Sequence, residues 1–200
     1  MITSIKFKQS DLTRITQKIK KLESNVMDIK KLYFVIEHYA RAYRHGVVKA
    51  IGTVAASTDM EGGGHAYPVI SFMDLSASPV GGWEPLSPQA VNSKIKRGGR
   101  VTFWYQTGTT FDAVSGATLV GSYSTNRTAT VFAGIDRARD AEAYKHAILT
   151  EFGGVNEKNK RVPARALFTI ANELFKTKRN EIEKAVMTAV LEGVNWGGAK

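Results

Sequence analysis

The stretch that decides the fold reads YKHAILTEFGG at residues 144–154 and continues as RVPARALF at residues 161–168. An apolar segment with an aromatic residue runs into a double glycine, and a charged loop follows. Pro163 then opens a helix, flanked by Arg161 and Arg165. This pattern supplies no nucleophile, metal cage or phosphate cradle. It therefore predicts a rigid structural joint rather than a reaction centre.

A heptad seam dominates the first fifty residues. Its apolar residues recur in alternating steps of three and four, at Leu12, Ile15, Ile19, Leu22, Val26, Ile29, Tyr33, Ile36, Ala40 and Tyr43. Such a pattern predicts one helix over residues 12–43, roughly 48 Å long at 1.5 Å per residue, with an N-cap at Ser10 or Asp11. We expect Gly46 to loosen or end this helix, with residues 47–54 continuing it or turning toward the sheet. The seam could pack within the chain or against a neighbouring subunit.

Turn residues divide the rest of the chain. Residues 57–82 are rich in Gly and Ser and predict a flexible insertion, with a strand or further insertion at residues 67–73. Pro88 predicts a helix start, Gly98 and Gly99 its end, and residues 101–105 a strand. Residues 118–123 and 128–133 predict a hairpin, and residues 141–151 a short helix. Apolar stripes from Leu167 to Val190 predict a C-terminal helical region, and residues 193–200 a tail. We expect these parts to form a single α+β domain over residues 1–200.

Charge is uneven along the chain. The formal net charge is +10, and residues 1–50 hold 11 Lys and Arg against 4 Asp and Glu, which gives +7. Two interpretations are open: attraction to a polyanion such as DNA, or a solvated helix face. The chain has no cysteine, which excludes disulfides and thiolate zinc sites. We expect no signal peptide and no membrane span, because no apolar run reaches about 18 residues.

The sequence offers no catalytic, cofactor-binding or metal-binding constellation. The four histidines, His38, His45, His65 and His146, lie in dissimilar contexts with no carboxylate at ligand spacing. No serine sits in a nucleophile elbow, and no carboxylate pair suggests a general acid and base. The triple glycine at residues 62–64 has no following Gly-Lys-Ser/Thr, so it is not a phosphate loop. We therefore predict a protein that is not an enzyme and needs no cofactor.

Two ordered blocks carry a family resemblance. The first is WEPLSP at residues 83–88, followed by a lysine, an apolar strand and Thr107-Gly108; the second is the EFGG and PAR run quoted above. Together they resemble the virion-morphogenesis or tail-completion proteins of tailed bacteriophages over about residues 80–190, with a core at 83–192. This chain departs from the family at Ala166-Leu167-Phe168, where proline-phenylalanine is more usual, and in a longer insertion at residues 57–82.

The resemblance implies a long N-terminal helix (residues 1–50, basic) packed on a small antiparallel sheet and closed by a C-terminal helix. It implies a structural virion protein at the head–tail junction, assembled in the host bacterial cytoplasm. Copies would form a homo-oligomeric neck or collar ring around the DNA channel. The ring would bind head connector or portal-adaptor proteins on one face and tail-tube or tail-terminator proteins on the other.

Site predictions follow from this interpretation. The predicted subunit or partner contacts are Trp83, Arg161, Arg165 and Trp196, with the arginines meeting a neighbour's carboxylates. The predicted DNA-channel lining, with non-specific contacts only, is Lys94, Lys96, Arg97 and Arg100. Two alternatives remain: a tail terminator or minor tail protein, and, from another class, a cytoplasmic basic DNA-binding protein.

Overall fold

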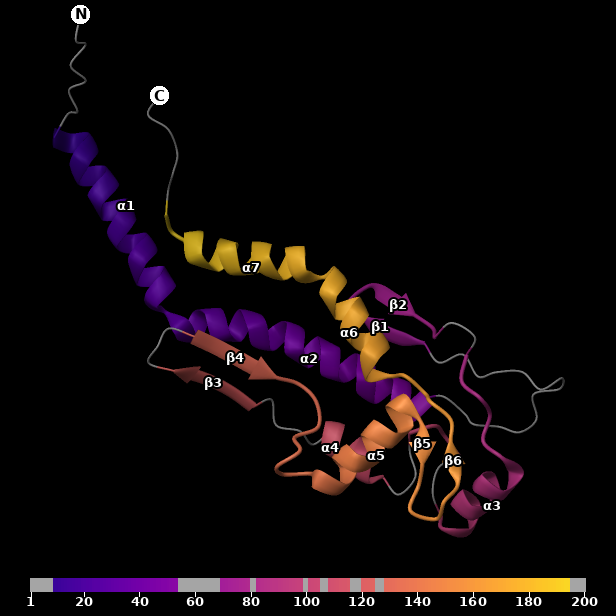
Figure 1. The fold of residues 1–200 in the computed structure, drawn as a ribbon. Coiled ribbons are helices and arrows are strands. Elements are labelled where there is room, and N and C mark those ends of the chain that lie inside the picture. The colour runs from indigo at the N-terminus through magenta and orange to yellow at the C-terminus, as the bar shows by residue number, and fades with distance from the viewer. Residues whose placement is uncertain are drawn as a thin grey trace, which may run out of the picture. The chain divides into compact units, whose positions relative to one another are not determined.

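The computed structural model describes residues 9–53, 69–79, 82–98, 101–104, 108–115, 120–124 and 128–194. The fold is α+β and dominated by helices, as predicted. In the described ranges, strands occur only as three separate two-stranded sheets, β1–β2, β3–β4 and β5–β6. The single small sheet expected from the resemblance is therefore replaced by three hairpins (Figure 1).

Residue contacts divide the chain into two compact units. Unit 1 comprises Met1–Glu37, Gly121–Val131 and Asn180–Lys200, and unit 2 comprises His38–Val120 and Phe132–Arg179. Each unit combines segments distant in sequence. The prediction of one domain over residues 1–200 stays a prediction.

The long N-terminal helix is broken. Helix α1 spans Gln9–Met27 and α2 spans Ile29–Thr53, with Asp28 between them. The Asp28 carboxylate accepts a hydrogen bond from the Lys31 amide at 3.2 Å, as an N-cap does. Because a new helix is capped there, the predicted continuous helix over residues 12–43 is wrong.

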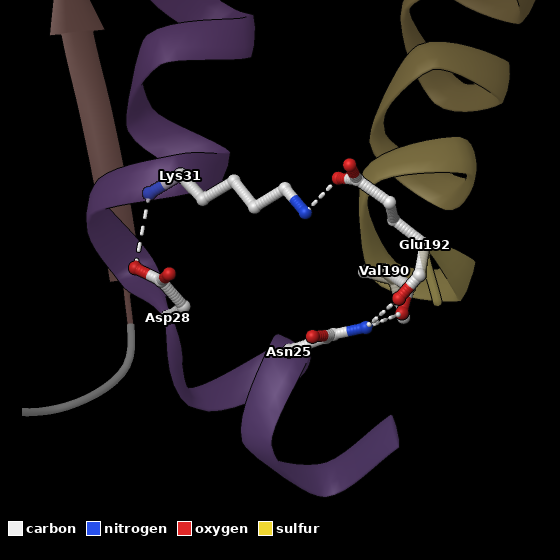
Figure 2. A network of polar contacts seen from close by, with 5 residues as sticks. All are labelled: Asn25, Asp28, Lys31, Val190 and Glu192. Atoms are coloured by element: carbon white, nitrogen blue, oxygen red, sulfur yellow. Dashed lines mark hydrogen bonds and ion pairs between the residues drawn. The ribbon is translucent and has the colours of Figure 1, made fainter. Parts of the chain in front are cut away.

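Unit 1 joins the ends of two helices. Helix α7 spans Arg179–Leu191, and the buried Asn25 side chain of α1 donates to the carbonyls of Val190 and Glu192, both at 2.7 Å (Figure 2). The last carbonyls of a helix have no partner inside it, so Asn25 satisfies the end of α7. An ion pair between Lys31 and Glu192 lies beside it and lowers the pKa of that carboxyl.

Unit 2 is built around the second half of α2. Strands β1 (Ile70–Phe72) and β2 (Leu75–Ala77) pair antiparallel with Phe72 opposite Leu75, and α6 (Phe168–Thr177) lies beside them (Figure 1). The Phe175 ring meets Tyr43 and Phe72 at centroid distances of 5.6 and 5.2 Å. This hairpin falls within residues 57–82, and β1 confirms a strand within the range predicted for one, residues 67–73. The flexible insertion over residues 57–82 stays a prediction.

Gly46 lies inside α2 and does not end it. A Cβ atom at this position would overlap the carbonyl oxygen of Ser71 in β1. The absence of a side chain therefore lets the helix backbone approach the strand backbone. The helix continues past Gly46 to Thr53, so of the two predicted courses for residues 47–54, continuation of the helix or a turn toward the sheet, the first is confirmed.

Several local predictions are confirmed. Helix α3 spans Pro88–Lys96, with the Ser87 side chain accepting the Ala90 amide. Helix α5 spans Ala141–Phe152, and β3 (Val120–Ser124) pairs with β4 (Thr128–Phe132). Helix α4 (Thr109–Ser115) was not predicted. Of the strand predicted at residues 101–105, the described residues 101–104 contain a single bridge residue, Thr102, followed by a turn at 103–104, and Trp104 has a φ of 61°. The triple glycine and most of the tail lie outside the described residues.

Among the described residues, no helix has the length and apolar content needed to cross a membrane.

Candidate functional site

The joint predicted from residues 144–168 centres on a buried carboxylate. Glu151, 4% exposed, lies in the last turn of α5. Its carboxylate accepts the backbone amides of Leu167, Phe168 and Thr169 at 2.8, 3.0 and 2.7 Å. These amides open α6, where N–H groups lack partners and the helix dipole favours negative charge. Glu151 therefore caps α6 from another helix.

This contact sets the start of α6. The helix begins at Phe168, five residues after Pro163, so the predicted start at Pro163 is wrong. The chain between them is held by backbone bonds, including the Arg165 amide to the Thr150 carbonyl at 2.7 Å. Gly153 has a φ of 71°, and a Cβ there would lie 2.8 Å from the Ala164 nitrogen. The double glycine thus provides the close approach that the joint needs.

Arg165 completes the joint from inside unit 2. Its guanidinium donates through Nε and Nη2 to the Glu84 carbonyl at 3.2 and 2.9 Å, and lies 5.0 Å from the Phe103 ring centroid. The Arg165 carbonyl accepts the Trp104 indole N–H at 3.1 Å. Burial lowers the pKa of this guanidinium, and the Glu84 charge opposes that effect. Arg165 is therefore a structural clamp between segments 81 residues apart.

The joint carries three exposed apolar side chains. Ile148 and Phe152 lie four residues apart on α5, hence on one side of the helix, and Val155 follows in β5. Their exposed fractions are 43%, 67% and 61%. Val155 pairs with Arg161 across the β5–β6 hairpin, and directly opposed residues project to the same face. We call Ile148, Phe152, Val155 and Arg161 the docking face.

The hairpin under this face is short and well bonded. Strands β5 (Gly154–Val155) and β6 (Arg161–Val162) are antiparallel. The Asn156 side chain accepts the amides of Lys158 and Lys160 at 3.0 and 2.9 Å, and the Asn156 amide donates to the Lys160 carbonyl. Basic side chains follow one another in this turn, at Lys158, Lys160 and Arg161, all exposed. The docking face therefore combines apolar side chains with a basic edge.

The four predicted contact residues have different positions. Arg161 is exposed and belongs to the docking face. Trp83 is 2% exposed and packs edge-on against Phe103 at 5.4 Å, and Arg165 is 6% exposed. Both side chains are therefore core elements, and their predicted contact with a partner is wrong. Trp196 lies outside the described residues.

The four residues predicted to line the DNA channel also differ in position. Lys94 is half-buried and donates to the Thr102 carbonyl at 3.0 Å. Burial, and then repulsion by Arg165, lowers its pKa from 10.5 to about 8. The hydrogen bond holds the Lys94 ammonium against its own chain, and the predicted role of Lys94 in the channel lining stays a prediction. Lys96 and Arg97 are exposed at the end of α3, and Arg100 lies outside the described residues.

Groups suited to chemistry are dispersed. His38, His45 and His146 are exposed, and His146 lies 3.7 Å from Glu142 on the surface of α5. His65 lies outside the described residues. Across the described part of the chain, no group of three His, Asp or Glu side chains is placed to hold a metal ion. Tyr43 donates to Asn172 at 2.9 Å, and burial raises the pKa of its hydroxyl.

Glu151 and Phe152 both belong to the EFGG run, but the sequence analysis predicts no function for either residue. The signal for Phe152 was available: a large aromatic residue directly before a double glycine, four residues after Ile148. No local signal marks Glu151, because its partners lie 16 to 18 residues further along the chain.

Comparisons with known proteins identify no related protein. A scan against protein-family models, a search of curated proteins and a search of solved structures each found no match.

Proposed function

We propose that this protein is a structural subunit of a tailed-bacteriophage virion, acting in the neck or collar ring that joins the DNA-filled head to the tail. The observation that carries the proposal is the docking face, where Phe152 and Val155 are more than 60% exposed on a joint fixed by the buried Glu151. Large apolar side chains displayed on a rigid base are typical of protein interfaces. The motifs around this joint are those that resemble the phage family.

The docking face suits a contact with another protein chain. Apolar side chains form the buried centre of such contacts, and charged groups form the rim. Its basic edge, Lys158, Lys160 and Arg161, complements carboxylates on the neighbour. Repeated around a ring, the same weak contact is strengthened because each docked subunit raises the effective concentration for the next.

The DNA channel supplies a second, smaller part of the proposal. Lys96 and Arg97 are exposed at the C-terminal end of α3 and carry charges that a phosphate backbone attracts. Two cations with no base-reading element suit passive lining of a channel. The partners would be head connector or portal-adaptor proteins and tail-tube or tail-terminator proteins, in particles assembled in the bacterial cytoplasm.

Removal of the gene from its phage, followed by electron microscopy of the particles, tests this function. DNA-filled heads lying apart from complete tails are the expected result. Tails of abnormal length, or missing tails, would indicate a tail terminator or minor tail protein instead. Normal infectious particles would contradict a structural role. Salt-sensitive binding of the free subunit to duplex DNA would then favour the DNA-binding alternative.

Complementation with variants tests the docking face itself. Val155→Asp places a charge in the face, whereas Val69→Asp makes the same change at a residue with a similar exposed fraction, 56% against 61%, outside the face. We expect Val69→Asp to restore infectious particles and Val155→Asp to leave heads and tails apart. Equal complementation by both variants would refute the assignment of this face.

A further inference from the structure

Helix α1 presents an uncovered apolar seam in unit 1. Leu12, Ile15, Ile19 and Val26 are exposed by 43%, 46%, 54% and 43%, and Leu22 is half-buried. Four large aliphatic side chains in one row on a 19-residue helix form a continuous apolar strip. Such a strip is stabilised when another helix covers it.

The contact between α1 and α7 leaves this strip open. Asn25 holds the end of α1 to the last carbonyls of α7 (Figure 2). At 100° per residue, Asn25 projects about 100° away from Val26 and so lies on a flank of the seam. The α7 end therefore fixes the base of α1 while the row from Leu12 to Ile19 remains exposed.

Heptad positions identify the occupant. The steps along the seam assign positions a to Leu12, Ile19 and Val26, and positions d to Ile15 and Leu22. The flanking g and e positions then include Lys18 and Glu23, which are five residues apart. In a parallel, in-register pair of helices, the g residue of one chain faces the e residue five positions later in the other. Lys18 therefore meets Glu23 of a second copy, and the contact occurs twice.

The remaining cations of α1 avoid the seam. Arg14 and Lys21 occupy c positions and Lys20 a b position, on the outer side of the helix. A different, acidic partner protein would place its carboxylates next to Glu23 at the edge of the seam, and these like charges would repel one another. A second copy of the same helix matches both flanking charges and covers the strip with an identical apolar row.

We propose that α1 pairs in parallel and in register with α1 of a second copy of this chain, through the seam from Leu12 to Val26. Because each copy gives the same contacts that it receives, the pair has two-fold symmetry and closes as a dimer. Self-association through α1 does not depend on the proposed place in the virion, since it requires only the purified chain.

Charge reversal with mixing provides the first test, using the full chain and analytical ultracentrifugation over a concentration series. Lys18→Glu and Glu23→Lys each place like charges opposite one another twice, so each weakens self-association about tenfold. An equimolar mixture of the two variants pairs every Glu with a Lys and recovers the wild-type association. Lys20→Glu, with the same charge change on the outer side, alters the dissociation constant less than about threefold.

Several results would overturn the proposal. The first is that the wild-type chain stays monomeric throughout the concentration series. The second is that the mixture of Lys18→Glu and Glu23→Lys does not recover the wild-type association. The third is that Lys20→Glu weakens association as much as Lys18→Glu does. Circular dichroism of each variant shows whether helix content is kept. A loss of association that accompanies lost helix content is resolved by the cross-linking experiment.

Cysteine cross-linking tests the orientation, and the absence of native cysteine makes it specific. Under mild oxidation, Ile15→Cys in the full chain forms a disulfide with itself only when copies are parallel and in register, because a disulfide needs Cα atoms within about 7 Å. Thr13→Cys, on the outer side, does not. Cross-linking of Ile15→Cys to Val26→Cys in preference to either self-link would show antiparallel helices, in which d positions face a positions, and no cross-link would show no pairing. Both results contradict the proposal.

Discussion

Replacement of Glu151 by glutamine tests the joint most directly. The change keeps the size of the side chain and removes its charge. Gln has one carbonyl oxygen, which can continue to accept the Leu167 and Phe168 amides that now share one carboxylate oxygen. The Gln NH2 group then faces the Thr169 amide, donor against donor. The variant therefore loses one hydrogen bond and the interaction of a negative charge with the start of α6.

The magnitude follows from the burial of each amide. Hydrogen bonds to charged groups contribute roughly 1.5–3 kcal/mol each. Thr169 is exposed, so its amide can be hydrated in the variant, whereas Leu167 is fully buried. We therefore expect Glu151→Gln to lower the free energy of unfolding by about 2 kcal/mol. Glu151→Ala, which also leaves the Leu167 amide without a partner, should lower it by about 3–5 kcal/mol.

Urea unfolding followed by tryptophan fluorescence measures this loss, at constant protein concentration because self-association would shift the midpoint. For an m-value of about 2 kcal/mol/M, the Gln variant unfolds about 1 M earlier. Hydrogen exchange of the Leu167 and Phe168 amides should accelerate in parallel. Glu142→Gln, an exposed change on the same helix, should cost less than about 0.5 kcal/mol. A Glu151→Gln midpoint equal to that of Glu142→Gln, with unchanged exchange, would refute the capping role.

Three further predictions concern unit 2. Arg165→Lys should lower the free energy of unfolding by about 1–3 kcal/mol, because a single ammonium cannot replace the two guanidinium nitrogens that donate to the Glu84 carbonyl. Urea unfolding measures this loss, and an unchanged free energy of unfolding would contradict the role of Arg165 as a clamp. Gly46→Ala should cost about 1–3 kcal/mol in the same assay, since the new methyl overlaps the Ser71 oxygen; stabilisation, as expected for alanine in a free helix, would disprove the close approach. Lys94 has a folded pKa of about 8 and an ordinary pKa of 10.5, so between these values the unfolded state holds more protons and stability rises with pH. In Lys94→Met, urea midpoints at pH 7.5 and 10 should lack this rise, and an unchanged difference would argue against the buried lysine.

Sequence reasoning located the elements whose signals are local. The helix at Pro88 carries its own N-cap at Ser87, and the hairpin of β3 and β4 lies between recognisable turn residues. The prediction of a structural joint agrees with the contacts of Glu151 and Arg165. In each case the residues that specify the structure are also those that form it.

Predictions failed where partners distant in sequence decide the outcome. The planar donor fork of arginine led us to predict that Arg165 meets a neighbour's carboxylates, but the Glu84 carbonyl 81 residues away holds the side chain inside. The start of α6 is fixed by Glu151 rather than by Pro163. Asp28 caps a second helix inside the heptad pattern, and the prediction of one continuous helix gave this residue no role. Heptad spacing fixes which side chains share a face, yet it does not require one unbroken helix.

The two proposed contacts depend on different buried groups, and this allows them to be separated. The docking face lies on the end of α5 and on the hairpin that follows it, so its geometry depends on the Glu151 joint in unit 2. The α1 seam belongs to unit 1, where Asn25 holds the base of the helix. Local stability differs between parts of a protein, and a contact fails when the part that supports it opens. A weakened joint should therefore impair docking while α1 still self-associates, whereas a charge reversal in α1 should leave the docking face intact.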